Sequence, residues 1–197
     1  MSRPSNRENR RNELLPLIAE AFGELGYRRA TTAAIASRCG VQETILYRLW
    51  DDKKAMFLAV IDYLVTWRTN RIRSVLDRVP EEEDPLEFLI GDVASTLGEH
   101  GLQRVLYAAL GELGDPDIRG ALRGMYDQNH RLILDLLGEG GKTQGPPPPA
   151  SEKDAAWAIM GLVTMMDLTS ELELLGPRQR KDVFKRIARA LLGLADD

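Results

Sequence analysis

Five side chains in a short segment could form hydrogen bonds to a partner while their neighbours are buried. They are Gln42, Glu43, Thr44, Tyr47 and Arg48. Apolar residues recur between them at helical spacing, at positions Ile45, Leu46, Leu49 and Trp50. One face of this helix therefore packs inward and leaves the polar face available. Its side chains are types that read DNA bases: glutamine pairs with adenine, arginine with guanine, and a threonine methyl touches a thymine methyl.

The residues before this helix predict a second short helix and a tight turn. Thr31 is a suitable N-cap, and Ile35 lies on the buried face of the helix that follows. Gly40 is placed where the chain must adopt a left-handed conformation, and Val41 fills the angle between the helices. Two short helices joined in this way form a helix-turn-helix, whose second helix enters the DNA major groove.

An ordered set of residues across the first third of the chain resembles the N-terminal domain of the TetR family of transcriptional repressors. The set comprises Gly26-Tyr27, Thr31, Ile35-Ala36, Gly40-Val41, Leu46-Tyr47, Trp50 and Lys53. The resemblance implies phosphate contacts from Thr31, Tyr47 and Lys53, flanked by Arg28 and Arg29. It implies base contacts from Gln42, Glu43, Thr44 and Arg48.

Three positions depart from the TetR pattern. Glu43 stands where such sequences often have lysine. It either accepts a hydrogen bond from a cytosine amino group or is a solvated charge that tilts away, and the sequence leaves both open. Ile45 and Leu49 occupy places often held by a hydroxyl and a histidine, so two possible phosphate contacts are missing. We expect modest, salt-sensitive non-specific affinity.

The helical pattern predicts an all-α chain of about nine helices. We expect a helix-turn-helix domain, the head, at residues 1–54 and a helical effector-binding and dimerisation domain at residues 55–197. The first helix ends at Gly26; it begins near Arg7 or Glu13, and we favour the earlier start with a bend at Pro16. Later helices are expected from about 51 to as far as 79, then at 85–98, 102–113, 116–138, 153–175 and 178–195, with a loop at 138–151.

The last two predicted helices carry more apolar surface than one chain can cover. The helix at 153–175 is apolar around most of its circumference. The helix at 178–195 has one apolar stripe, opposite the charged residues Arg180, Lys181, Lys185, Arg186 and Arg189. We expect a homodimer that buries these two helices of each chain in a four-helix bundle, as TetR-like proteins do. A monomer with a larger core is the alternative.

The resemblance also implies a small-molecule effector that binds among the C-terminal helices. Its candidate contacts are aromatic residues, methionines and one asparagine, although aromatic and methionine side chains at helical spacing usually belong to the core. They are Trp67, Tyr107, Tyr126, Asn129, Trp157, Met160 and Met166. Asp92, His130 and Asp167 also fall among apolar residues, where they could orient a ligand or pair with arginine. A largely apolar effector is the hypothesis. The alternative is a helical protein with a weakened head that acts without an inducer.

Charge is divided unevenly along the chain. The net charge is −4, yet residues 1–54 carry 10 Lys and Arg against 7 Asp and Glu, and the remainder carries 16 against 23. Affinity for DNA depends on local positive charge opposite the phosphates, so the net charge does not exclude DNA as a partner. The arginines at the N-terminus could add phosphate contacts or belong to a frayed end.

No pattern of catalytic or metal-ligating residues stands out. The two histidines, His100 and His130, are far apart, and Asp127 with His130 gives only half of a metal site in a helical bundle. We therefore expect no enzyme activity, cofactor or metal. Cys39, the single cysteine, is expected to be a small buried residue, and a redox-sensing thiol is the alternative. The chain has no apolar run of membrane-spanning length and no signal-peptide segment, so we expect a cytoplasmic protein without a membrane partner.

Overall fold

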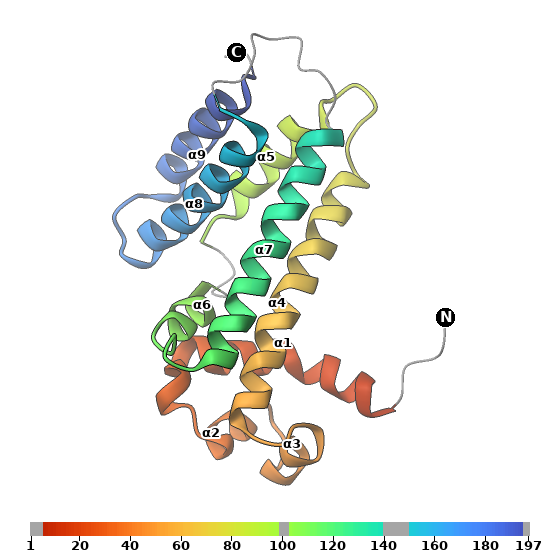
Figure 1. Ribbon diagram of the computed structural model, residues 1–197, viewed down its shortest axis with the longest axis vertical. Coiled ribbons are helices and arrows are strands. Elements are labelled where there is room, and N and C mark those ends of the chain that lie inside the picture. Colours follow the sequence, from red (N-terminus) through yellow and green to blue (C-terminus); the bar gives the residue numbers. More distant parts are fainter. Residues whose placement is uncertain (1–5, 99–102, 140–149, 195–197) are drawn as a thin grey trace. The chain divides into compact units, whose positions relative to one another are not determined.

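The computed structural model describes residues 6–98, 103–139 and 150–194, and within these ranges every regular element is a helix. The all-α prediction is confirmed, with nine helices in the described ranges (Figure 1). They are α1 (Asn6–Arg29), α2 (Thr32–Arg38), α3 (Glu43–Leu49), α4 (Lys53–Leu76), α5 (Pro85–Thr96), α6 (Gln103–Leu110), α7 (Pro116–Glu139), α8 (Glu152–Glu171) and α9 (Pro177–Leu192). Most of the expected loop at 138–151 and the first five residues lie outside the described residues.

The helices form two compact units. The first unit contains described residues 6–67 and 103–126, and the second contains 68–98, 127–139 and 150–194. The first unit thus includes the helix-turn-helix, the first part of α4, α6 and the start of α7. The functional boundary between residues 54 and 55 stays a prediction.

Helix α1 begins at Asn6, well before Pro16, which agrees with the favoured early start. Its regular part ends at Gly26, where the backbone turns to φ 71° and ψ 157° before a last short turn of helix. Glycine adopts this positive φ without the steric cost that a Cβ would bring. The predicted end of the first helix is therefore confirmed.

The predicted turn between α2 and α3 is present in full. The Thr31 hydroxyl accepts a hydrogen bond from the Ala34 N–H at 3.1 Å, which caps α2. At the other end Gly40 has φ 64°, the Val41 N–H donates to the Ala36 carbonyl, and the Gly40 N–H donates to the Ser37 carbonyl. These two bonds form a Schellman motif, which satisfies the last carbonyls of α2 and sets the direction of α3.

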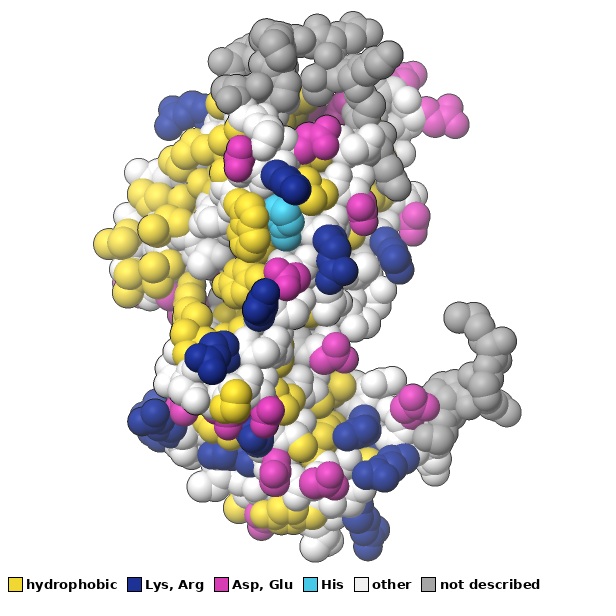
Figure 2. Space-filling model, viewed as in Figure 1, with side chains coloured by type: hydrophobic (Ala, Val, Ile, Leu, Met, Phe, Trp, Pro, Cys, Tyr) yellow, Lys and Arg dark blue, Asp and Glu magenta, His cyan; other side chains and the backbone are white. Residues whose placement is uncertain are grey.

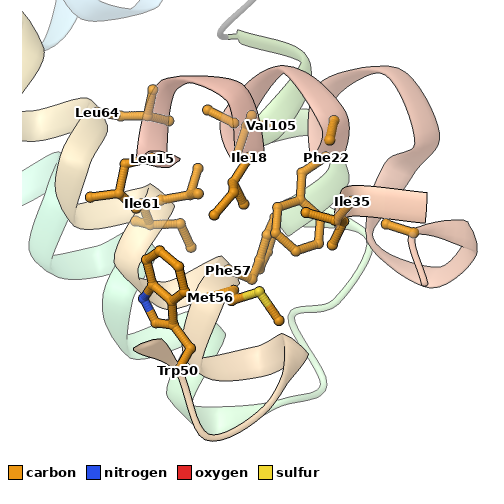
Figure 3. Packing of buried hydrophobic residues seen from close by; sticks show 14 of the residues in the cluster. Leu15, Ile18, Phe22, Ile35, Trp50, Met56, Phe57, Ile61, Leu64 and Val105 are labelled. Carbon is orange, nitrogen blue, oxygen red and sulfur yellow. The ribbon is translucent and has the colours of Figure 1, made fainter. Parts of the chain in front are cut away.

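The core of the first unit holds these short helices in place. Leu46, Leu49 and Trp50 are buried in one apolar cluster with residues of α1, α2, α4 and α6. Figure 3 shows Trp50 in this cluster beside Met56 and Ile61 of α4. The Phe22 and Phe57 rings meet edge to face with centroids 4.8 Å apart. An isolated seven-residue helix is unstable in water. The position of α3 thus depends on this apolar contact.

The second unit is built on α5, α8 and α9. Phe184 and Ala188 of α9 lie in one core with Ile90 of α5 and Met166 of α8. Helix α8 ends at Glu171, earlier than predicted, because the chain turns there and Glu173 takes a left-handed φ of 55°.

Arg180 corrects the predicted charged stripe of the last helix. Its side chain is buried, and its guanidinium donates to the Leu175 carbonyl at 2.6 Å. The hydrogen bond to the α8–α9 turn draws this residue inward, which a helical pattern alone does not indicate.

Gly40→Ala is expected to lower the free energy of unfolding by about 1 kcal/mol, because alanine would have to keep the left-handed backbone. Gly120→Ala is the matched control: this exposed helical glycine has no atom within 4 Å of an added Cβ. It should raise the free energy of unfolding by about 0.5–1 kcal/mol. Urea denaturation measures both, and a stabilising Gly40→Ala would contradict the strain argument.

Candidate nucleic-acid interface

The α2–α3 turn presents a continuous polar face. Gln42 is the N-cap of α3 and is exposed, as are Thr44, Tyr47 and Arg48 along the helix. Glu43 is partly buried in the first turn of α3. Four of the five residues predicted to read a partner thus share the side of α3 opposite Leu46 and Leu49, and Gln42 is exposed at the start of the helix.

Tyr47 links this face to the start of α2. Its side chain is 53% exposed, and its hydroxyl donates to the Thr32 hydroxyl at 3.4 Å. Thr32 follows the N-cap Thr31, so the phenol lies beside free N–H groups of the first turn of α2. Such N–H groups, together with hydroxyls, suit a phosphate oxygen.

Lys53 is held against Tyr27 at the start of α4. Its ammonium donates to the Tyr27 carbonyl at 2.9 Å and lies 4.5 Å from the centre of the Tyr27 ring. An ammonium has three N–H donors, so this bond leaves others for a phosphate. Burial, and next the carboxylates of Asp115, Asp52 and Glu112, raise the pKa of Tyr27.

The flanking arginines differ in their contacts. Arg28 pairs with Glu112, with Nε 2.7 Å from Oε1, and this pair raises the pKa of Arg28. Arg29 donates to the Leu25 carbonyl of its own helix. Arg48 has neither a hydrogen bond nor an ion pair among the described residues. Arg48, which is predicted to contact a base, is thus more available to a partner than Arg28.

Two arginines of α1 have a structural role that the sequence reading missed. Arg7 donates to the Leu49 carbonyl at 3.3 Å, and the Arg11 guanidinium lies 5.3 Å from the centre of the Trp50 ring. Their i, i+4 spacing indicates that both lie on one face of α1. It does not indicate which residues they contact, because their partners at the end of α3 are about 40 residues away in the sequence. Both fix the end of α3 that is nearest to α4.

Cys39 is buried at the end of α2. Burial, and to a lesser degree the Glu20 carboxylate, raise the pKa of its thiol. A raised pKa disfavours the thiolate, which is the reactive form. The structure therefore supports a packing role for Cys39 over redox sensing.

The effector candidates fall in both units. Trp67, Tyr107 and Tyr126 belong to the first unit, whereas Asn129, Trp157, Met160 and Met166 belong to the second. Asn129, Met160 and Met166 are buried, but Trp157 is 49% exposed and stacks on the His130 ring at 4.6 Å. Among the residues described, the buried Asn129 Oδ1 has no hydrogen-bond partner.

The two aspartates for which two roles were open have protein partners. Asp92 pairs with Arg71 at 2.5 Å and with Arg78 at 3.9 Å. Asp167 accepts a hydrogen bond from the Gly98 N–H at 2.9 Å. Pairing with arginine is thus the role of Asp92 in this structure.

Residues 6–98, 103–139 and 150–194 contain neither a candidate metal site nor a candidate membrane-spanning helix. No group of three or more His, Cys, Asp or Glu residues in those ranges could hold a metal ion, and His100 lies outside them. No helix in the described part of the chain is both long and apolar enough to cross a membrane.

Residues 14–60 match the family model described as bacterial regulatory proteins, tetR family. The match contains α2, α3 and the residues predicted to contact DNA from Arg28 to Lys53.

Known proteins resemble the chain over most of its length. The nucleoid occlusion factor SlmA of Vibrio vulnificus is 29% identical over 164 residues, which are 81% of this chain and 82% of SlmA. The fatty acid degradation regulator FadR of Bacillus halodurans has a similar fold, with a TM-score of 0.67, 18% identity and 97% of each chain covered. AibR, solved with isovaleryl coenzyme A and operator DNA, has a TM-score of 0.67 and 13% identity, covering 94% of this chain and 100% of AibR.

Tyr47→Phe is expected to weaken binding of duplex DNA several-fold and by the same factor on every sequence, because a phosphate contact carries no sequence information. Tyr63→Phe, on a partly buried tyrosine of α4, removes the same group away from this face and should leave affinity unchanged. Fluorescence anisotropy with several duplexes measures both. A loss confined to one sequence would assign Tyr47 to base reading instead.

Proposed function

We propose that this chain, which belongs to the TetR family of bacterial regulatory proteins, is a repressor that a small, largely apolar effector releases from its operator. The chain is a DNA-binding transcriptional regulator with the TetR-like fold. Repression, a pseudopalindromic operator and the effector are the proposed parts.

The exposed polar face of α3 is the observation that carries the proposal. Gln42, Thr44 and Arg48 are side chains that can pair with base edges, and they are exposed on one short helix. Thr31, Tyr47 and Lys53 supply donors for phosphates beside it. This separation of positioning and reading residues is typical of helix-turn-helix proteins.

Apolar side chains on α8 and α9 support a homodimer. Trp157, Met165 and Ile187 are 49%, 52% and 39% exposed. Figure 2 shows hydrophobic side chains gathered over the region of these two helices. A symmetric pair of chains would bury this surface and present two heads to two half-sites.

The buried amide of Asn129 supports an effector in the second unit. Leaving a buried polar group without a hydrogen bond costs about 1–3 kcal/mol. A ligand that donates a hydrogen bond to Oδ1 would remove this cost, and buried apolar residues such as Met160 suit a largely apolar molecule. Release of DNA requires that this ligand prefer the conformation whose heads do not fit the operator.

A second candidate is a DNA-binding protein that acts without an inducer. The likeness to SlmA, described as a nucleoid occlusion factor, favours it, since it extends over both units. Ile45 and Leu49 also deprive the head of two possible phosphate contacts. For either function we infer a cytoplasmic location, because the proposed partner is DNA. We infer no enzyme activity, because the sequence carries no recognisable pattern of catalytic residues.

Selection of bound duplexes from a random pool tests the operator proposal. The protein is expected to enrich a two-fold symmetric site whose binding weakens steeply with salt. A parallel selection with Glu43→Ala should change the preferred base at one position of each half-site if Glu43 accepts from cytosine. If Glu43→Ala lowers affinity equally for the selected site and a scrambled site, Glu43 does not read a base. If the unaltered protein enriches no site, the helix-turn-helix domain does not bind DNA specifically and the operator proposal is wrong.

Asn129→Leu is expected to raise the free energy of unfolding of the ligand-free protein by about 1 kcal/mol, because leucine removes an unsatisfied buried amide. Thr169→Val is the matched control. The buried Thr169 hydroxyl donates to the Met166 carbonyl at 2.8 Å, so its removal should not raise the free energy of unfolding. Urea denaturation compares them. Destabilisation by Asn129→Leu would show a structural role for the amide and remove its support for an effector.

A further inference from the structure

Three carboxylates cluster where α6 passes into α7. Glu112 and Asp115 lie in the connection between the helices, and Asp117 lies in the first turn of α7; we call residues 111–117 the acidic turn. The preceding helix fixes its position, because Val105, Leu106 and Ala109 of α6 belong to the same buried core as α1. The acidic turn is therefore part of the first unit, together with the helix-turn-helix.

Asp115 and Lys54 tie the acidic turn to α4. Asp115 accepts hydrogen bonds from the N–H groups of Asp117 and Ile118, which caps α7. The Lys54 ammonium lies 3.3 Å from Asp115 and 2.6 Å from Asp117. Burial alone would raise the pKa of Asp115, but the two backbone hydrogen bonds and Lys54 lower it below its ordinary value.

Glu112 reaches a cation of the head. Its two oxygens lie 2.7 Å from Nε and 3.5 Å from the second terminal nitrogen of Arg28. The Arg28 side chain remains 79% exposed, whereas that of Glu112 is only 18% exposed. The carboxylate is thus the more buried partner, and the guanidinium is the one that solvent or a ligand can reach.

Arg28 lies close in the chain to the expected phosphate contacts. It precedes the N-cap Thr31 by three residues, and the first turn of α2 follows at once. A carboxylate and a phosphate both engage a guanidinium through paired oxygens, so one arginine cannot serve both fully. An ion pair this exposed is weak enough for a phosphate to displace it.

The electric field of the acidic turn extends beyond this one pair. After burial, the carboxylate of Asp115 contributes most to raising the pKa of Tyr27, and Glu112 also contributes. Lys53 rests on this same Tyr27 ring. The acidic turn therefore acts electrostatically on the residue that holds Lys53, a second expected phosphate contact.

We propose that Glu112 competes with DNA phosphates for Arg28, so that the acidic turn limits the affinity of the head for any sequence. Arg28 contributes a phosphate contact only when Glu112 releases it. The proposal rests on the proposed function, because it requires that the head binds DNA.

Glu112→Gln tests the competition in the full-length protein with a mixed-sequence duplex and a salt series. Release of Arg28 should steepen the slope of log K, where K is the association constant for DNA, against log salt concentration by about 0.9 per protomer. It should also raise the affinity for DNA about tenfold at about 0.1 M salt. Asp62→Asn removes the same charge from an exposed position on α4 of the first unit and is the matched control. It should raise affinity less and leave the slope unchanged.

Combination with Arg28→Ala separates competition from a general charge effect. Arg28→Ala alone should change affinity less than twofold, because Glu112 already holds the arginine. In the Arg28→Ala background, the gain from Glu112→Gln should disappear. A gain that persists without Arg28, a large loss from Arg28→Ala alone, or weaker binding by Glu112→Gln would each overturn the proposal.

The same experiment distinguishes failure of this inference from failure of the proposed function. If the unaltered protein and all variants bind no duplex at low salt, the DNA-binding function itself fails. If all bind equally with equal salt slopes, DNA binding stands and the competition by Glu112 is wrong.

Discussion

Burial of one side of α3 is the constraint on which the recognition face depends. Seven residues do not form a stable helix alone, so Leu46, Leu49 and Trp50 hold α3 by packing against α1 and α4. Their burial at helical spacing leaves Gln42, Thr44 and Arg48 on the opposite side. The same contact that stabilises the short helix therefore orients the residues that face a partner.

Local signals explain why much of the head could be predicted. The Thr31 cap and the left-handed Gly40 are determined by a few adjacent residues, and both are confirmed. Long-range pairings have no such signal: Arg28 meets a carboxylate 84 residues away, and Arg7 meets a carbonyl 42 residues away. Arg180 likewise looks solvent-facing on a helical projection, yet the α8–α9 turn supplies a carbonyl that draws it inward.

The charge of the head is less available than its composition suggests. Lys and Arg outnumber Asp and Glu in residues 1–54, but Arg10 and Arg38 pair with carboxylates of the head itself. Arg28 and Lys54 pair with the acidic turn. A phosphate contact from any of these four cations would exchange a protein ion pair for a phosphate, and its free energy would be the difference between two similar interactions. This pairing is a second reason, besides Ile45 and Leu49, to expect modest affinity for DNA.

The buried amide of Asn129 bears on the choice between an inducible regulator and a protein that acts without an inducer. A protein with no ligand in its second unit gains nothing from an unsatisfied amide, and an apolar residue of similar size would be more stable there. Strain or unpaired groups that persist in a native fold are expected at functional sites, where a partner compensates for them. Asp92 and Thr169 of this unit have protein partners. The buried Arg180 Nε, like Asn129 Oδ1, has no hydrogen bond among the described residues, but the Arg180 guanidinium is held through its bond to the Leu175 carbonyl. The unsatisfied amide of Asn129 is an argument for the ligand-responsive function, whereas the likeness to SlmA over both units is an argument for the other.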